Sequence, residues 1–345
     1  MTVLYVEKPG LLTTVQDLGR HGFQAYGLPA AGAADPYALQ LANVLAGNDP
    51  GEAALEMTLA GPVLRVLAGG LVAVAGADLE ARRNGSPLPL WETVAVQSGD
   101  VLSFGGARRG CRAYLALGGG VAVPEVLGSR STYLRCRLGG LEGRALRAGD
   151  RVASREETGR IFRRVPAPFV PEYGASHTVR VVPGPQDDHF TPAGVQAFLT
   201  GEYRVANDSD RMGCRLAGPA IEHRPGMADI VSDGVPPGAV QVPGHGQPIV
   251  LLADRQTTGG YPKIACVVST DLWRLAQAKP GDSIRFVPVS LDEAHRLYRI
   301  YREQFVSLCR QLRTGDMAGK QYRVSIGGTT HDVWVEESVA EYRKR

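Results

Sequence analysis

The two halves of this chain repeat one order of helix signals and glycine–proline turns. Asp35-Pro36 and Thr191-Pro192 each place a capping side chain before a proline, and such a pair starts a helix. Leu59-Ala-Gly-Pro62 and Leu216-Ala-Gly-Pro219 follow these helix starts at similar distances. A pattern written twice restricts the chain to two copies of one architecture, so we predict two related domains in tandem.

Short strands dominate both halves. Gly99-Asp100-Val-Leu-Ser-Phe104 matches Gly281-Asp282-Ser-Ile-Arg-Phe286, and each is a Gly-Asp turn before a short strand. The clearest strand signals are Leu71–Ala75, Val94–Val96, Arg112–Leu117, Thr178–Val182, Pro248–Leu252 and Ile264–Val268. With 43 Gly and 23 Pro in 345 residues, this rhythm is typical of β-barrels or sandwiches rather than a doubly wound sheet. We expect a mainly β fold with a few helices.

A linker separates the halves. The charged stretch Ser154 to Arg164 lacks apolar periodicity and is followed by several prolines. We therefore place an N-terminal β-barrel domain at 1–160 and a C-terminal β-barrel domain with a closing helix at 175–314. The remaining residues, 315–345, are predicted to form a β-hairpin tail from Gln321 to Glu337, as an edge ribbon rather than a partner-docking element.

The closing helix has its own signals. Ser290 and Glu293 form a capping box at its start. A continuous apolar stripe at helical spacing follows, and it consists of Leu291, Ala294, Leu297, Tyr298, Tyr301, Phe305, Leu308 and Leu312.

Composition excludes several classes of protein. The net charge of +3, with both signs mixed along the chain, gives no reason to expect binding to nucleic acid or to a membrane. No apolar run approaches the roughly 20 residues of a membrane span, and the first residues do not resemble a secretory signal. The five cysteines are odd in number and widely spaced, so we expect reduced thiols in a cytoplasmic protein.

The stretch Leu252-Ala-Asp-Arg-Gln-Thr-Thr-Gly-Gly-Tyr-Pro-Lys263 concentrates the chemistry of the chain. Apolar runs on both sides predict a strand that leads into this loop and another that leaves it. Paired glycines let backbone N–H groups approach an anion closely. The predicted site residues here are Asp254 and Lys263 in catalytic roles, and Arg255, Gln256, Thr257, Gly259 and Gly260 in substrate binding. The alternative is a hairpin with a surface salt bridge.

A second cluster lies in Thr13-Thr-Val-Gln-Asp17-Leu-Gly-Arg20-His21-Gly22. We predict that Arg20 binds a carboxylate or carbamoyl substrate, that Asp17 is catalytic and that His21 titrates near neutral pH and binds substrate. The alternative is a structural Asp–Arg pair that fixes a β-turn.

A third cluster joins Gly118-Gly-Gly to Leu127-Gly-Ser-Arg-Ser-Thr-Tyr133. Hydroxyls around Arg130 suit an anionic ligand, so Arg130 and Ser131 are predicted to bind substrate; the alternative is an arginine in a surface pair. No P-loop pattern is present.

Other motifs lack a complete catalytic set. Asp187, Asp188 and His189 are adjacent, and adjacent side chains on an extended chain point in opposite directions, so we predict no metal site. Asp210 and Arg211 are expected to pair and to order the barrel mouth. The sequence has no nucleophile elbow, His-Glu-x-x-His or dinucleotide fingerprint. It also has no Met-Lys-Met, so biotin is not expected on this chain.

Six motifs resemble the biotin-dependent carboxyltransferase family. They are Thr14-Val-Gln-Asp-Leu-Gly-Arg20-x-Gly, Gly118-Gly-Gly, Leu127-Gly-Ser-Arg-Ser-Thr-Tyr133, Pro183-Gly-Pro-Gln-Asp187, Ser209-Asp-Arg-Met-Gly213 and Ala253-Asp-Arg-Gln-Thr-Thr-Gly-Gly-Tyr261. The family includes subunits of 5-oxoprolinase, which the motifs resemble most closely, subunits of allophanate hydrolase, and antagonists of kinase inhibitors. The resemblance implies two cyclophilin-like β-barrel domains in tandem.

The resemblance also implies an activity and partners. The implied reaction is the ATP-dependent opening of 5-oxo-L-proline to L-glutamate, with Mg at the level of a complex. The implied partners in that complex are two other 5-oxoprolinase chains, a kinase-inhibitor-like B subunit plus the A subunit. One alternative is a carboxyltransferase for urea or a related amide that uses biotin carried elsewhere. Another is a non-catalytic antagonist of a kinase-inhibitor-like partner.

Residue chemistry assigns roles within the first reading. Arg20, Arg130 and Arg255 would bind the substrate carboxylate or a phosphorylated oxyanion. Asp17 and Asp254 would orient those arginines or assist proton transfer, and Lys263 would add positive charge.

Overall fold

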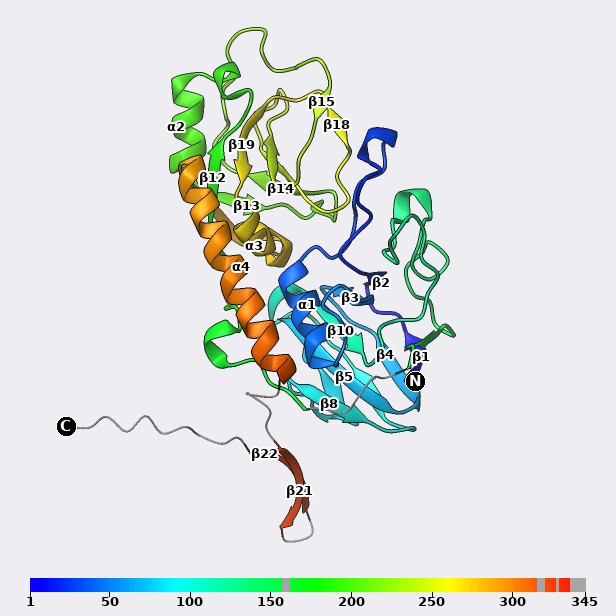
Figure 1. The fold of residues 1–345 in the computed structure, drawn as a ribbon. Coiled ribbons are helices and arrows are strands. Elements are labelled where there is room, and N and C mark those ends of the chain that lie inside the picture. Colours follow the sequence, from blue (N-terminus) through cyan, green and yellow to red (C-terminus); the bar gives the residue numbers. More distant parts are fainter. Residues whose placement is uncertain (157–161, 315–319, 327–328, 336–345) are drawn as a thin grey trace, which may run out of the picture.

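The computed structural model describes residues 1–156, 162–314, 320–326 and 329–335, and it shows two β domains joined by a long helix (Figure 1). The predicted mainly β fold with few helices is confirmed. Within the described residues, no helix is both long and apolar enough to cross a membrane.

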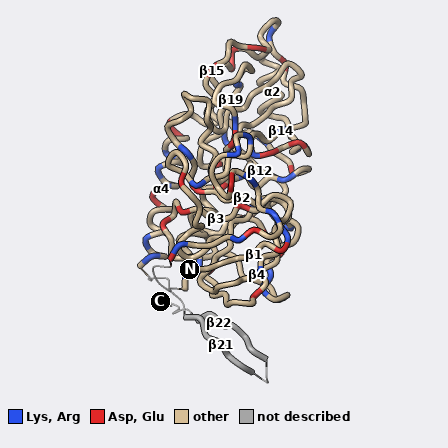
Figure 2. The backbone as a smooth tube through the Cα atoms, turned by 90° about the vertical axis from the view of Figure 1, so that its right-hand side faces the viewer, with Lys and Arg blue, Asp and Glu red and all other residues tan. Residues whose placement is uncertain are grey.

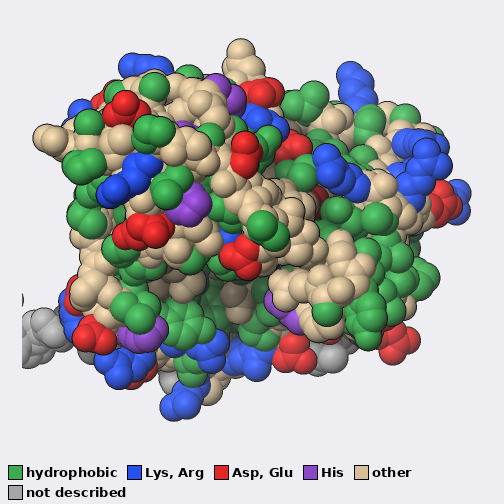
Figure 3. Space-filling model, turned by 90° about the horizontal axis from the view of Figure 1, so that it is seen from above, with side chains coloured by type: hydrophobic (Ala, Val, Ile, Leu, Met, Phe, Trp, Pro, Cys, Tyr) green, Lys and Arg blue, Asp and Glu red, His purple; other side chains and the backbone are tan. Residues whose placement is uncertain are grey.

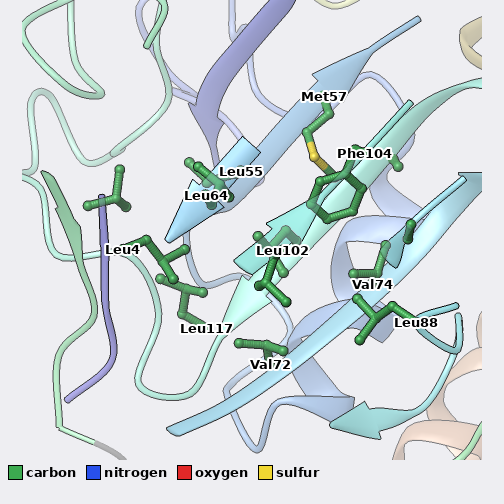
Figure 4. Close-up of a cluster of buried hydrophobic side chains, with 14 of the residues drawn as sticks. Leu4, Leu55, Met57, Leu64, Val72, Val74, Leu88, Leu102, Phe104 and Leu117 are labelled. Carbon is green, nitrogen blue, oxygen red and sulfur yellow. The ribbon is translucent and has the colours of Figure 1, made fainter. Parts of the chain in front are cut away.

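Two antiparallel sheets form the N-terminal domain. Their strands are β1 (Val3–Lys8), β2 (Leu12–Gln16), β3 (Ala54–Thr58), β4 (Val63–Ala68), β5 (Gly70–Asp78), β6 (Arg82–Arg83), β7 (Ser86–Pro87), β8 (Thr93–Val96), β9 (Val101–Ser103), β10 (Arg109–Leu117) and β11 (Arg151–Ala153). One sheet has the order β11-β1-β4-β9-β6-β7 and the other β2-β3-β10-β5-β8. Leu4 and Leu64 from the first sheet pack with Leu55 and Val72 from the second in one hydrophobic core (Figure 4).

A closed barrel forms the C-terminal domain. Its strands are β12 (Ser176–Pro183), β13 (Tyr203–Val205), β14 (Gly213–Ala217), β16 (Ala239–Gln241), β17 (Ile249–Leu251), β19 (Lys263–Val267) and β20 (Ser283–Pro288), and β15 (Asp233–Gly234) pairs with β18 (Thr258–Gly259) beside it. The barrel order is β12-β19-β16-β17-β14-β13-β20. Phe198 stacks on Phe286 inside the barrel, with ring centroids 4.5 Å apart, so this domain has a core of its own.

The helix starts follow the predicted caps. In α1 (Pro36–Leu45), the Asp35 carboxylate accepts a hydrogen bond from the Ala38 N–H at 3.2 Å. In α2 (Pro192–Thr200), the Thr191 hydroxyl accepts one from the Gly194 N–H at 3.0 Å. Both helices therefore begin where a short polar side chain precedes proline.

The two Gly-Asp turns have the same internal hydrogen bond. Gly99 and Gly281 have φ angles of 94° and 91°, which glycine adopts without strain. The Asp100 carboxylate accepts from the Gln97 N–H at 2.8 Å, and the Asp282 carboxylate accepts from the Lys279 N–H at 3.0 Å. This equivalence supports the predicted relation between the domains.

The long helix α4 (Leu291–Thr314) contacts both domains. It begins beside the C-terminal barrel, and its second half packs on α1, where Tyr37 meets Phe305 with ring centroids 5.7 Å apart. Leu308 and Leu312 are buried there, whereas Leu291 and Tyr298 are exposed. The predicted apolar stripe is thus covered only in its C-terminal half, and α4 connects the two domains.

Two further segments were predicted. β21 (Lys320–Ile326) and β22 (Thr329–Val335) pair antiparallel, as the hairpin prediction requires, while its last residue, Glu337, lies outside the described residues. Of the predicted linker, 157–161 lie outside them too, and Arg164 bridges to Glu92 in the N-terminal domain.

Candidate functional site

Asp17 holds two loops of the N-terminal domain together. Its buried carboxylate accepts hydrogen bonds from the hydroxyls of Ser129, at 2.7 Å, and Ser131. It also accepts from the backbone N–H groups of Arg130, at 2.6 Å, and Gly19, at 2.8 Å. Three of these four donors belong to the 127–133 loop. The second and third sequence clusters are therefore one structural unit, and Asp17 is its central acceptor.

Arg20 is fully buried in the same unit. Its Nε donates to the carbonyl of Val126 at 3.0 Å, and its Nη2 donates to the carbonyl of Ser131 at 3.0 Å. Burial lowers the pKa of Arg20, and the negative charge of Asp17 partly opposes that effect. Arg20 therefore anchors the 126–131 segment through backbone carbonyls instead of forming the anticipated pair with Asp17.

Two predicted residues of this unit face solvent. His21 is exposed, and its Nε2 lies 3.1 Å from the carbonyl of Leu18. Arg130 is partly exposed, with its Nη2 3.3 Å from the Glu125 carboxylate. Both remain accessible to a ligand or partner.

A buried ion cluster joins the two domains. Arg211 donates to both oxygens of Asp254, at 2.9 and 2.8 Å, and its Nη1 pairs with Glu56 of the N-terminal domain. Its Nη2 also donates to the carbonyl of Gly32 at 2.6 Å. All three charged side chains are at most 8% exposed. Figure 2 shows acidic and basic segments close together near β2 and β12, at the level of this junction.

The predicted pair of Asp210 with Arg211 is wrong. Asp210 accepts from the backbone N–H groups of Met212, at 2.8 Å, and Gly213, at 3.1 Å. Arg211 instead points into the domain junction, where Glu56 and Asp254 neutralise it. Adjacent residues face different sides of the chain, so the acid next to Arg211 in sequence caps a turn.

A cavity of about 290 Å³ lies between the domains beside this cluster. Its lining includes Leu12, Thr58 and Arg112 from the N-terminal domain, and Arg211, Leu252 and Leu275 from the C-terminal domain. Two arginines and a hydroxyl among apolar walls form a pocket of the kind that binds small polar molecules.

The predicted loop at 252–263 lies in the C-terminal domain between β17 and β19, as expected. Arg255 is buried, and its Nε donates to the carbonyl of Val235 at 2.9 Å. Burial lowers the pKa of Arg255, and no carboxylate of the described residues forms an ion pair with it. Its charge is therefore compensated only by carbonyl dipoles.

Lys263 is also buried and is held by an ion pair. Its Nζ lies 2.8 Å from the Asp233 carboxylate and 3.2 Å from the carbonyl of Gly234. This contact lowers the pKa of Asp233, which is itself exposed. For Lys263, the geometry is that of the salt-bridged hairpin considered as the alternative.

The other predicted residues of this loop lie at its accessible edge. Gln256 donates to the Gln241 side chain at 3.1 Å. Thr257 and Gly260 accept backbone hydrogen bonds through their carbonyls, and Gly259 lies in β18. Seen from the barrel end, the surface mixes acidic and basic side chains (Figure 3). None of the four side chains or glycines is fully buried.

The N-terminal unit and the 252–263 loop approach each other at Tyr133. Burial raises the pKa of Tyr133, and the nearby negative charge of Asp254 contributes to that rise. The clusters predicted around Asp17, Arg130 and Asp254 therefore border one junction between the domains.

Sequence reasoning missed Glu56 and Arg112 at this junction. Glu56 lies within the buried strand β3, and Arg112 lies within the apolar strand β10. A charged residue inside an apolar strand must find a partner when it is buried. That signal was present in the sequence, but it does not identify the partner.

Asp35 is a second buried acid at the junction. Its Oδ2 accepts from Gln277 of the C-terminal domain at 2.8 Å. Burial raises the pKa of Asp35 to about 6, above the value of about 3.9 of an exposed aspartate. The native state therefore binds this proton more tightly than the unfolded state does. The resulting stability is fully present below about pH 4 and is lost as the pH rises through 6.

We expect Asp35→Asn to remove this dependence. Relative to the wild type, the free energy of unfolding of the variant should rise by about 2–3 kcal/mol between pH 4 and pH 7. Urea denaturation at both pH values measures the difference. Asp208→Asn, at an exposed position, is the control and should show no such change. A constant difference between Asp35→Asn and wild type would contradict the assignment.

Comparison with known proteins gives consistent relatives. A family model described as "Carboxyltransferase domain, subdomain A and B" matches residues 26–288. The chain is 40% identical over 311 residues to the C subunit of 5-oxoprolinase from Escherichia coli (strain K12), and the alignment covers 90% of this chain and 99% of that protein. It is 37% identical to the protein of the same name from Haemophilus influenzae, over 84% of this chain and 94% of that protein.

A solved structure supports the fold. The urea carboxylase of Kluyveromyces lactis superimposes with a TM-score of 0.84 at 31% identity. The match covers 89% of this chain and 29% of that chain, so this chain spans less than a third of that enzyme.

Proposed function

We propose that this chain, which belongs to the carboxyltransferase domain family with subdomains A and B, acts as the C subunit of a 5-oxoprolinase. The observation that carries the proposal is the 40% identity to the Escherichia coli protein, because the alignment covers 99% of that protein. No large part of the relative is missing from the match. The two domains and their junction are thus common to both chains.

The reaction would convert 5-oxo-L-proline to L-glutamate with ATP, together with a kinase-inhibitor-like B subunit plus the A subunit. The ring amide is unreactive, so activation of its carbonyl oxygen by ATP is a chemical need. Among the described residues, the junction offers bound carboxylates and guanidinium groups but no free nucleophile–base pair. This is the composition of a subunit that completes its active site with a partner.

ATP and Mg belong, in this proposal, to the assembled complex. The cavity of about 290 Å³ is at the small end for ligand pockets and suits a small substrate rather than a nucleotide. In the part of the chain that the structure describes, no group of three or more His, Cys, Asp or Glu could hold a metal ion. Biotin is not attached to this chain.

The accessible residues would face the substrate or the partner. His21, Arg130, Gln256 and Thr257 border the junction and keep exposed side-chain atoms. The uncompensated charge of Arg255 would contribute positive potential to the same region. Asp17 and Arg20 would hold the 127–133 loop in place. We also propose a cytoplasmic location, which the five unpaired cysteines support.

Substrate choice tests the proposal. The three subunits, co-expressed and purified together, are expected to form glutamate from 5-oxo-L-proline plus ATP without biotin or bicarbonate. The same preparation should not consume urea. Glutamate formation that requires biotin and bicarbonate would contradict the proposal.

A carboxyltransferase for urea is the second candidate. It is favoured by the superposition on urea carboxylase at a TM-score of 0.84. It requires a biotin carrier outside this chain, so avidin should abolish turnover if this candidate is right and leave it unchanged if the first is right.

A further inference from the structure

We propose that the cavity between the two domains binds a small carboxylate with an apolar body. Its ligand in this proposal is 5-oxo-L-proline, an identification that rests on the proposed function. The cavity itself is inferred from geometry alone.

Two unpartnered polar groups lie side by side in the cavity lining. Arg112 and Thr58 are directly opposite each other on the paired strands β10 and β3. Side chains at such positions share one face of the sheet, with Cβ atoms about 4.5–5.5 Å apart. Arg112 is 5% exposed and Thr58 is 8% exposed, yet Nε of Arg112 and Oγ1 of Thr58 have no hydrogen-bond partner among the described residues.

An unused pair of donors is costly unless a ligand or water satisfies it. A buried donor without a partner costs about 1–3 kcal/mol. A carboxylate has two oxygens, so it can accept from the guanidinium Nε–H and the threonine hydroxyl at once. This pairing explains why both groups are retained at adjacent positions of a buried surface.

The charge of Arg112 is incompletely neutralised. Its nearest carboxylate is Glu56, with the Nε atom 3.9 Å from Oε1. That same Oε1 already pairs with Nη1 of Arg211. Nη1 of Arg112 donates to the carbonyl of Ala276, which brings dipolar but no ionic compensation. A ligand anion would therefore meet a guanidinium that is still short of negative charge.

The remaining walls suit the apolar part of such a ligand. Leu12, Leu252, Leu275 and Ala278 line the same cavity. The ring methylenes of 5-oxo-L-proline could pack on these side chains while its carboxylate faces Arg112. At about 290 Å³, the cavity holds a molecule of this size and excludes a nucleotide.

Calorimetric titration of the full chain, alone and in the assembled complex, tests the inference. The probes are 5-oxo-L-proline and 2-pyrrolidinone, which has the same ring without the carboxylate. The first should bind and the second should not. Thr58→Val should weaken binding about 5-fold or more by removing one hydrogen bond. Ala278→Leu should abolish binding by filling the cavity.

Thr270→Val is the matched control. Thr270 is likewise 8% exposed with an unpartnered Oγ1, but it does not line the cavity. Its replacement should leave binding unchanged. Thermal melting shows whether each variant is folded, and Thr58→Val remains informative if Ala278→Leu does not fold.

The outcomes separate this inference from the proposed function. Absence of binding to the chain and to the complex, or equal binding by all variants, would overturn the inference even if the complex forms glutamate. Binding that depends on Thr58, in a complex that forms no glutamate, would retain the carboxylate site and overturn the proposed reaction.

Discussion

Replacing Arg211 by methionine is expected to lower the free energy of unfolding by about 3–5 kcal/mol. Arg211 lies between Glu56 and Asp254, and its removal leaves two carboxylates buried without their main partner. The cost arises from those unpaired charges rather than from the loss of favourable attraction alone. Urea denaturation of the wild type and the variant at pH 7 measures the change.

Arg285→Met is the matched control. Arg285 forms an ion pair with Glu202 at 2.7 Å, but its side chain is 63% exposed. Exposed pairs contribute about 0–1 kcal/mol. Equal effects of the two substitutions would contradict the role given to the buried cluster. Restoration of stability by also replacing Glu56 and Asp254 with Gln and Asn would support it.

The second large effect concerns activity. Arg255→Ala is expected to lower glutamate formation by the assembled complex at least about 100-fold, the loss typical of removing one charge-stabilising donor from an active site. The guanidinium of Arg255 is buried without a carboxylate partner among the described residues, so its charge is available to act on a nearby anion. Steady-state glutamate release by the purified complex measures the effect.

Two comparisons separate this role from a structural one. Arg255→Lys keeps the charge and should retain part of the activity, whereas Arg204→Ala, at an exposed side chain, should keep all of it. Size-exclusion chromatography shows whether each complex assembles. Full activity of an assembled Arg255→Ala complex would refute the assignment.

Local features of the fold were predictable from the sequence. The caps of α1 and α2 depend on a polar residue and a proline that are adjacent in the chain. The Gly-Asp turns depend on four consecutive residues with one positive φ. Apolar runs likewise located the strands around the 252–263 loop. In each case, the interaction that decides the structure lies within a few residues.

The domain junction was not predictable in the same way. Arg211 pairs with Glu56, 155 residues away, and with Asp254, 43 residues away. Sequence proximity pointed to Asp210, which caps a turn instead. Asp17 similarly bonds the loop at Ser129 and Ser131, more than 100 residues away. Such pairs depend on how whole domains pack, and no local pattern contains that information.

The relation of α4 to the domains has the same origin. Its apolar spacing predicted a helix, and the helix is present. The spacing did not show that its second half packs on Tyr37 and α1 of the other domain. Periodicity identifies a buried face, but the surface that covers this face is decided by the tertiary fold.

The central claim is that this chain is a required subunit of a 5-oxoprolinase. The most direct test measures glutamate release from 5-oxo-L-proline plus ATP by the A and B subunits with this chain, and by the same mixture without it. The account predicts glutamate only in the full mixture. No glutamate from a folded, assembled complex, or equal release without this chain, would contradict it.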